Sequence, residues 1–168
     1  MCIRDRNLRS ILLSSVRSWL FNSVVSERVK THSWQTLFTG EPANLDSSNS
    51  VFTVEDASLE NERLRALDIH PTAPLWGQGD ESFTASASDG LANLEHSVLA
   101  QYSELKTGLE LARLDYQRRP LRVIAKQLKW QYEQVNDERL DCVLSFELNR
   151  GQFATSILRE LVLERGSQ

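Results

Sequence analysis

The side chains of this sequence that are best suited to chemistry are its cations, which gather in two zones. Between Arg113 and Lys129 the chain carries six Arg or Lys residues and a single acid, Asp115. Another six cations against two acids fall within residues 1–40, whereas residues 41–100 hold two cations and eleven acids. Clustered cations bind phosphate, so both basic zones could meet a polyanion. They could equally be solvated surface, the usual fate of a charge run.

A second notable residue is Phe153, in the segment RGQFATSILREL. It lies two residues after Gly151, where a predicted strand gives way to a helix. Such junctions usually carry small or polar residues. From the residues alone, packing of Phe153 in the core against the last helix is the simpler interpretation, and contact with a ligand is the alternative.

No catalytic or metal-binding constellation can be recognised in the sequence. It lacks a glycine-rich phosphate loop, a nucleophile elbow and paired metal ligands. Asp80 and Glu81 are adjacent acids on a predicted loop, where solvation is expected. His70 has no second ligand at a useful spacing. Cys2 and Cys142 do not suggest a disulfide framework, and Cys142 is expected to be a small buried residue of a strand.

The composition is that of an ordinary folded chain. The 168 residues are 40% hydrophobic and carry a net charge of −4, which allows a buried core. No apolar run approaches the length of a membrane span, and residues 1–20 mix Arg, Asp and Ser with apolar residues, unlike a signal peptide. We therefore expect a cytoplasmic protein.

Helical periodicity is strongest near the start of the chain. Apolar residues recur at helical spacing over residues 8–29 without Pro or Gly, which predicts one long helix. Its arginines would share a stripe that either meets phosphates or forms surface salt bridges. These arginines are Arg6, Arg9, Arg17 and Arg28.

Weaker elements follow, and prolines divide them. A short strand is predicted at residues 51–54, and Asp56 or Ser58 can cap a helix after it. The segment DIHPTAPLWGQGDE then reads as an extended loop, because proline removes a backbone donor. A surface linker is expected at residues 82–90.

Two more helices are predicted at residues 91–105 and 109–114, with a break at Thr107 and Gly108. After them the periodicity changes from helical to alternating. Alternation over residues 128–132 and 140–148 predicts an antiparallel hairpin with one face toward a core.

The hairpin has two predicted neighbours. A strand at residues 121–125 has the opposite phase and could join the hairpin through a bulge. A final helix is predicted at residues 155–164. One hairpin and one helix bury too little apolar area to fold alone. Because the rest of the sequence offers at most one convincing strand, the hairpin is expected to complete a sheet supplied from outside these residues.

Three segments in order carry a resemblance to a known family: RDRNLRSILLSSVRSWLFNSVVSERV, then DIHPTAPLWGQGD, then PLRVIAKQLKWQYE leading into LSFELNRGQFATSILREL. Together they resemble the second half of the TruD family, the tRNA pseudouridine(13) synthases. The resemblance implies an α+β fold with two parts. Residues 1–121 would form a mainly helical insertion domain, and residues 122–168 would supply the antiparallel hairpin and helix that complete a pseudouridine synthase catalytic domain.

The resemblance also implies a reaction on tRNA. Enzymes of this family break the C1′–N1 bond of one uridine, turn the base and rejoin it through C5, without a cofactor or a metal. The base must leave its stack to react. The family motif Gly-x-Phe-Ala-Thr-Ser matches from Gly151 to Ser156, so Phe153 is expected to contact the extruded uracil. Contacts with RNA are expected from Arg17, Arg118 and Arg119.

Two active-site elements of the family have no match in this sequence. The catalytic Asp belongs to a Lys-Asp-Arg type segment, and a second element belongs to an Asn-Tyr-Phe-Gly type segment. Both are expected upstream of residue 1, so the chain resembles a truncated synthase that needs this missing segment and is inactive alone. The alternative is a free-standing, non-catalytic tRNA-binding module whose hairpin finds another partner.

Overall fold

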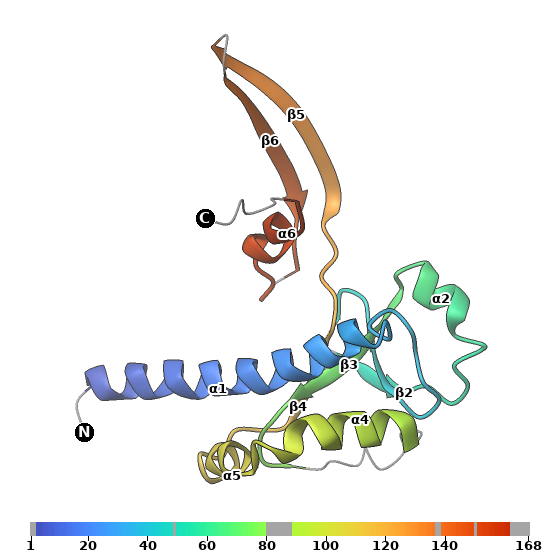
Figure 1. The fold of residues 1–168 in the computed structure, drawn as a ribbon, viewed down its shortest axis with the longest axis vertical. Helices are drawn as coiled ribbons and strands as arrows, with labels where there is room; N and C mark the ends of the chain where they lie inside the picture. The colour runs from blue at the N-terminus through green and yellow to red at the C-terminus, as the bar shows by residue number, and fades with distance from the viewer. Residues whose placement is uncertain (1–2, 49, 80–88, 137–138, 150, 162–168) are drawn as a thin grey trace. The chain divides into compact units, whose positions relative to one another are not determined.

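The computed structural model describes residues 3–48, 50–79, 89–136, 139–149 and 151–161 (Figure 1). The chain divides into two compact units, residues 1–122 and 123–168. The first unit combines helices with an antiparallel sheet, and the second holds a hairpin and a helix. The predicted α+β class is therefore confirmed. Asp80, Glu81 and most of the predicted linker lie outside the described residues.

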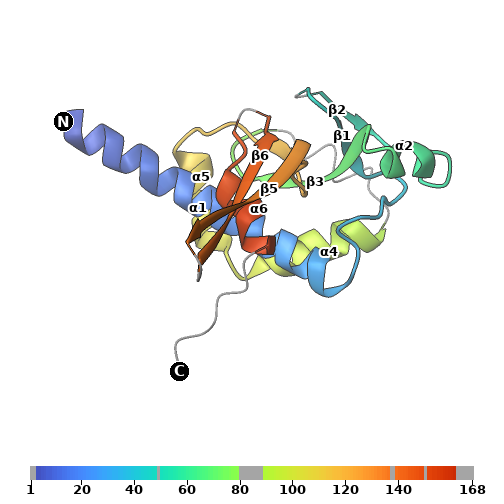
Figure 2. The same cartoon turned by 90° about the horizontal axis from the view of Figure 1, so that it is seen from above.

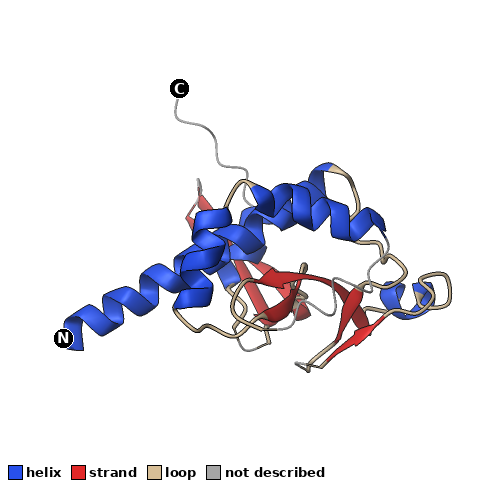
Figure 3. Ribbon diagram, turned by 90° about the horizontal axis from the view of Figure 1, so that it is seen from below, coloured by secondary structure: helices blue, strands red, loops and turns tan. Residues whose placement is uncertain are grey.

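Helix α1, Ile3–Lys30, contains the predicted long helix and extends it at both ends. Its second half buries Leu20 and Val24, while Leu13 and Val16 are partly buried in the same core. The first turns of α1 reach beyond the elements packed against that second half (Figure 3). Among the described helices, none is long and apolar enough to cross a membrane.

Helices α4, Asp89–Ala100, and α5, Ser103–Leu111, both contact α1 (Figure 2). The predicted break at residues 107–108 is wrong, because these residues lie inside α5 and the chain turns at residues 101–102 instead. A glycine costs a helix about 1 kcal/mol relative to alanine. Burial of Leu109, which is 1% exposed, offsets that cost.

The first unit contains a four-stranded antiparallel sheet in the order β2-β1-β3-β4 (Figure 3). The strands are β1, Pro42–Leu45; β2, Val51–Thr53; β3, Ile69–Leu75; and β4, Gln117–Pro120. Strand β2 was predicted, but the expectation of at most one convincing strand in this part of the chain is wrong. The reason lies in β3.

Strand β3 is the segment predicted as a loop, and all seven of its residues are buried. Pro71 and Pro74 argue against a central strand because neither can donate to a ladder. The ladder accommodates them by changing partner, since the first half of β3 pairs with β1 and the second half with β4. Among the described strands, each half of β3 therefore has a neighbouring strand on one edge only, and its other edge makes no ladder hydrogen bonds. A proline needs no partner there, but a buried carbonyl oxygen does.

Helix α2, Asn61–Arg65, begins several residues after Asp56 and Ser58, the two residues expected to cap it. The Asp56 carboxylate accepts the Ser58 N–H at 2.8 Å and the Ser58 hydroxyl at 2.6 Å. These bonds close a turn ahead of the helix, the local structure for which aspartate competes.

The second unit consists of β5, Lys126–Asn136, β6, Arg139–Glu147, and α6, Ala154–Leu161. The hairpin is confirmed, and its ladder has a register shift near the start of β5, where a bulge was predicted. The predicted strand at residues 121–125 is wrong, because the chain there is irregular between β4 and β5. The predicted end of the last helix lies outside the described residues.

A buried ion pair holds the end of α1. Arg28 Nη1 lies 2.9 Å from Glu41 Oε1, and both side chains are 0% exposed. Arg28 also donates to the carbonyl oxygens of Ser33 and Thr36, and the Phe38 N–H donates to Glu41 Oε2. Burial raises the pKa of Glu41. The charge of Arg28 and the hydrogen bonds that Glu41 accepts from Arg28 and from the Phe38 N–H oppose that shift. Arg28 therefore belongs to the interior and not to a phosphate-facing stripe.

We predict that Arg28→Met lowers the free energy of unfolding by about 3–5 kcal/mol, because it leaves the charge of Glu41 buried without a partner. Burial raises the pKa of Glu41, so its neutral form is favoured in the folded variant and stability is lost as the pH rises. The deficit should therefore shrink between about pH 8 and about pH 5. Urea unfolding at both pH values measures it.

Arg63→Met is the matched control, because it removes a partly exposed arginine that pairs with Glu60 and Asp68. It should cost no more than about 1 kcal/mol at either pH. A deficit in Arg28→Met that equals the control, or that does not change with pH, would contradict this interpretation.

Candidate functional site

Phe153 stands at the start of α6, after a tight turn that leads out of the hairpin. Gly151 has a φ of 84°, in the left-handed region that glycine tolerates. The Asn149 N–H donates to Gln152 Oε1 at 3.0 Å, and the Gln152 N–H donates to the Asn149 carbonyl at 3.1 Å. The Ser156 N–H donates to the Phe153 carbonyl at 3.0 Å, which starts the helix. Hydrogen bonds thus hold the backbone before and after the aromatic residue.

Phe153 is 67% exposed, so it does not fill a core within the described residues. Helix α6 buries none of its described residues, and Leu158 and Leu161 are exposed as well. A backbone that is held in place while the ring remains free can present that ring to a flat aromatic ligand such as a base.

The hairpin beside Phe153 in the sequence carries an apolar face that nothing in the described chain covers. Trp130 is paired with Leu144 and Tyr132 with Cys142, which places these side chains on one face. Trp130 and Tyr132 are each 65% exposed. Cys142 is exposed, so its predicted burial is wrong for the described chain. The alternation is typical of a core-facing strand, but the face is open.

Arg118 of β4 is enclosed, which contradicts its predicted contact with RNA. Its side chain is 2% exposed and bonds both carboxylate oxygens of Glu95 on α4, at 2.7 and 2.8 Å. It also donates to the carbonyl and hydroxyl oxygens of Thr72 and to the Tyr116 hydroxyl. Burial opposes the charge on Arg118, but Glu95 outweighs it and raises the pKa of Arg118 above its ordinary value. The pair joins α4 to the sheet.

Arg17 of α1 is also directed inward, contrary to its predicted contact with RNA. Its Nε donates to the Trp76 carbonyl at 2.8 Å, and its Nη2 donates to the carbonyls of Leu75, at 3.2 Å, and Asp115. Burial lowers the pKa of Arg17, the neighbouring Arg119 lowers it further, and Asp115 opposes both. Three backbone acceptors thus engage the Nε and Nη2 groups of this guanidinium.

Arg122 likewise donates hydrogen bonds to groups at the start of β3. Its Nη2 donates to the carbonyls of Leu64 and Ile69, each at 2.9 Å, and its Nε donates to His70 Nδ1 at 2.9 Å. Because a guanidinium only donates, His70 Nδ1 accepts, and the ring proton lies on Nε2, 3.2 Å from Asp46 Oδ1. Burial lowers the pKa of Arg122. His70 is thus a buried link between a cation and a carboxylate.

Sequence reasoning missed this role of the arginines because it treated β3 as a loop. The signal was present in the segment DIHPTAPLWGQ, where apolar residues and two prolines occur together. A strand with such prolines must leave carbonyl oxygens for other donors. Arginine, with five N–H groups, is well suited to supply them.

Arg119 is the one predicted RNA contact that remains on the surface. It follows Arg118 in β4 and therefore points to the opposite face of the strand. Arg119 is exposed, and within the described residues no hydrogen bond or ion pair engages its side chain. Arg6 and Arg9, also exposed, line a shallow hollow with Ser10, Leu13 and Ala112. Among the described residues, no group of three His, Cys, Asp or Glu side chains could hold a metal ion.

The fold and site define a two-unit α+β protein in which an anchored, exposed aromatic ring lies next to an open hairpin. The family model for tRNA pseudouridine synthase D (TruD) matches residues 3–161. The chain therefore belongs to the TruD family.

Known relatives agree with this assignment. The tRNA pseudouridine synthase D of Nitrosococcus oceani is 40% identical over 161 residues, which cover 95% of this chain and 43% of the relative. That of Aeromonas hydrophila is 41% identical over the same shares. A crystal structure assigned to tRNA pseudouridine synthase D from Methanosarcina mazei matches with a TM-score of 0.62 at 21% identity. It shares the fold over 86% of this chain and 36% of its own. The chain thus spans less than half the length of the curated relatives it matches.

The neighbours Arg118 and Arg119 provide a sharp test of the site. Arg118→Gln should lower the free energy of unfolding by about 3–5 kcal/mol, because Glu95 and the Thr72 carbonyl lose their buried donor. Arg119→Gln removes an exposed side chain and should change stability by no more than about 0.5 kcal/mol. Urea unfolding of the two variants measures both values. Equal effects would show that the inward and outward assignments are wrong.

Proposed function

We propose that this chain forms part of an enzyme that isomerises a uridine at position 13 of tRNA to pseudouridine. The family match over residues 3–161 and the relatives named tRNA pseudouridine synthase D support this function. In this proposal residues 1–121 are the insertion domain, and residues 122–168 complete the catalytic domain. The enzyme acts in the cytoplasm, where tRNA is available, and needs neither a cofactor nor a metal.

The observation that carries the proposal is the exposed ring of Phe153 on a backbone that hydrogen bonds hold in place. A uridine taken out of its stack loses its neighbouring bases, and an aromatic side chain can replace one of them. Stacking of this kind is worth about 1–3 kcal/mol per base. The turn at Gly151 and the start of α6 hold the Phe153 backbone on both sides, so little further ordering is needed on binding. Phe153 is therefore assigned to the uracil, as a contact and not as the catalyst.

The catalyst itself is assigned to polypeptide outside this chain. The essential carboxylate of the family belongs to the Lys-Asp-Arg type segment, which this sequence lacks. The open hairpin supports the same view, because two strands with an exposed apolar face are marginal in water and need a larger sheet. This exposed face also argues against the free-standing tRNA-binding module. Such a module would need a further partner to cover Trp130 and Tyr132.

Contact with the tRNA backbone is proposed for Arg119, whose side chain is exposed and faces away from the sheet interior. This proposal leaves out Arg118, whose side chain is buried against Glu95, and Arg17, whose Nε and Nη2 donate to backbone carbonyls. A phosphate contact from an exposed arginine releases a counterion, so it adds to affinity in a salt-dependent way.

A graft tests the catalytic proposal, with this chain replacing the matched region of the N. oceani synthase. We predict that the graft forms pseudouridine in an unmodified tRNA transcript and that the 168-residue chain alone does not. In the graft, Phe153→Ala should lower kcat/KM by about 5- to 150-fold, the equivalent of one lost stacking contact. The same change should leave stability within about 0.5 kcal/mol, because the ring is exposed.

Three results would count against this assignment: pseudouridine formed by the chain alone, unchanged kcat/KM in the variant graft, or a loss of stability equal to that of a core substitution. Leu20→Ala serves as the reference for such a core substitution, since Leu20 is fully buried. It should cost about 2–5 kcal/mol.

Binding of tRNA to the graft tests Arg119. Arg119→Gln should weaken binding at low salt and reduce the slope of log affinity against log salt by about 1. Arg65→Gln, which removes an exposed arginine of α2, is the control and should change neither quantity. Equal affinities and slopes in the two variants would show that Arg119 is ordinary surface charge.

A further inference from the structure

Helix α1 distributes its charge in the reverse of the usual way. A helix at the surface of a protein normally turns its charged residues to water. At about 100° per residue, the four charged residues between Leu8 and Val29 fall instead on the arc that faces the rest of the unit, whereas Lys30 at the end of the helix falls on the outward side. Arg17 and Arg28 are bonded in the interior, and Arg9 and Glu27 share their side of the helix.

The outward arc, from Leu8 to Val29, contains no charged residue and spans about 30 Å of helix. It carries large apolar side chains that are more than half exposed. These are Leu8, Ile11, Leu12 and Trp19. They recur at helical spacing, so they form a stripe separate from the buried one that contains Leu20 and Val24.

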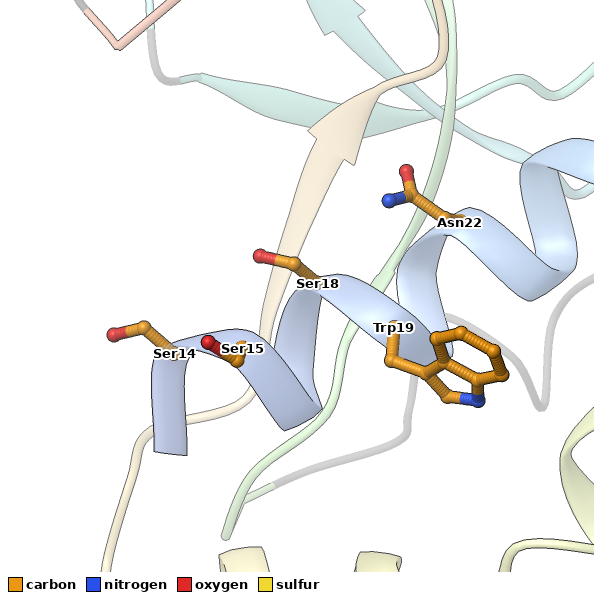
Figure 4. A pocket seen from close by; sticks show the side chains of 5 residues that line it. All are labelled: Ser14, Ser15, Ser18, Trp19 and Asn22. Carbon is orange, nitrogen blue, oxygen red and sulfur yellow. The ribbon is translucent and has the colours of Figure 1, made fainter. Parts of the chain in front are cut away.

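Small polar residues run beside the apolar stripe. Ser14, Ser18 and Asn22 follow one another at intervals of four and line a hollow with Ser15 and Trp19, whose indole projects from another side of the helix (Figure 4). Ser15 has turned its hydroxyl back to the Ile11 carbonyl at 2.9 Å, which leaves little polarity on that side. Ridges at intervals of four are the rows that interlock when helices pack, and small side chains on them allow a close approach.

The composition of this face decides what kind of partner it fits. A nucleic acid needs several cations, and between Leu8 and Val29 the face has none, so its composition does not favour tRNA. A membrane-surface helix is rich in Lys and Arg beside its apolar stripe, whereas two of the three arginines between residues 8 and 29 are bonded inward. Exposed Leu, Ile and Trp among small uncharged residues are typical of a protein interface.

We propose that the outward face of α1 packs against another segment of the same polypeptide, from the part of the synthase that lies outside these 168 residues. This inference rests on the proposed function, in which the chain is one portion of a longer enzyme. The curated relatives have more than half of their length outside the matched region. The open hairpin of the other unit likewise lacks a cover among the described residues.

The size of the face favours this partner over a second copy of the chain. A strip about 30 Å long and about 10 Å wide offers about 300 Å². A stable interface between separate proteins needs about 800 Å² from each partner. A segment of the same polypeptide needs less, because its tether raises its effective concentration to about the millimolar range.

Thiol labelling of Ser18→Cys tests the inference, in the isolated chain and in the N. oceani graft, with other cysteines replaced by serine. Ser18 lies on the outward face, and the substitution is nearly isosteric. The control is Glu104→Cys, at an exposed charged position of α5. We expect the thiol introduced by Ser18→Cys to react at least about tenfold more slowly in the graft than in the isolated chain. The thiol of the control variant should react equally in both.

Equal labelling of the Ser18→Cys variant in both polypeptides would overturn the inference. Protection of its thiol in the isolated chain that increases with protein concentration would also overturn it, in favour of a second copy. As a second readout, Ser18→Arg should lower the melting temperature of the graft by several degrees and leave that of the isolated chain unchanged. A melting temperature of the graft that Ser18→Arg leaves unchanged would place the face in contact with solvent and overturn the inference.

Pseudouridine formation by the unlabelled graft separates this inference from the proposed function. An active graft whose Ser18→Cys thiol reacts as fast as in the isolated chain would leave the function standing and refute the interface. A protected thiol in an inactive graft would support the interface and count against the function.

Discussion

The sheet of the first unit depends on arginine side chains that supply the donors its central strand cannot obtain from a ladder. Strand β3 carries two prolines and changes partner midway, so several of its buried carbonyl oxygens lack a neighbouring N–H. Arg122 bonds the carbonyl of Ile69, Arg118 that of Thr72 and Arg17 those of Leu75 and Trp76. Each guanidinium satisfies several acceptors at once. Helix α1, strand β4 and the segment after it are thereby tied to β3.

This arrangement changes the meaning of the charge in the sequence. Clusters of arginine suggest a surface that binds phosphate. In this chain, however, Arg17, Arg118 and Arg122 donate to backbone oxygens, and Arg28 pairs with a buried carboxylate. The arginines that remain exposed are those whose position in a strand or helix turns them outward, such as Arg119. A count of cations in the sequence therefore overstates the number of arginines exposed on the surface of this protein. Their direction relative to the sheet is what matters.

Two surfaces of the chain are unusually apolar for faces in contact with water. One is the hairpin face with Trp130 and Tyr132, and the other is the outward side of α1 with Trp19. Both are composed like the interior of a protein, although they belong to different units. Together with the length of the relatives, they support the proposal that this chain is one portion of a larger enzyme.

Local patterns in the sequence determined the long first helix, the C-terminal hairpin and the turn at Gly151, because period, alternation and a positive φ are properties of neighbouring residues. The family motif likewise marked Phe153 as a contact residue, and this stays a prediction. The strand β3 and the inward direction of Arg17 and Arg118 were decided only by the tertiary structure. Whether prolines can occupy a strand depends on which side of it has ladder partners, and whether an arginine meets water depends on which acceptors lie within its reach. Both conditions involve residues far apart in the chain.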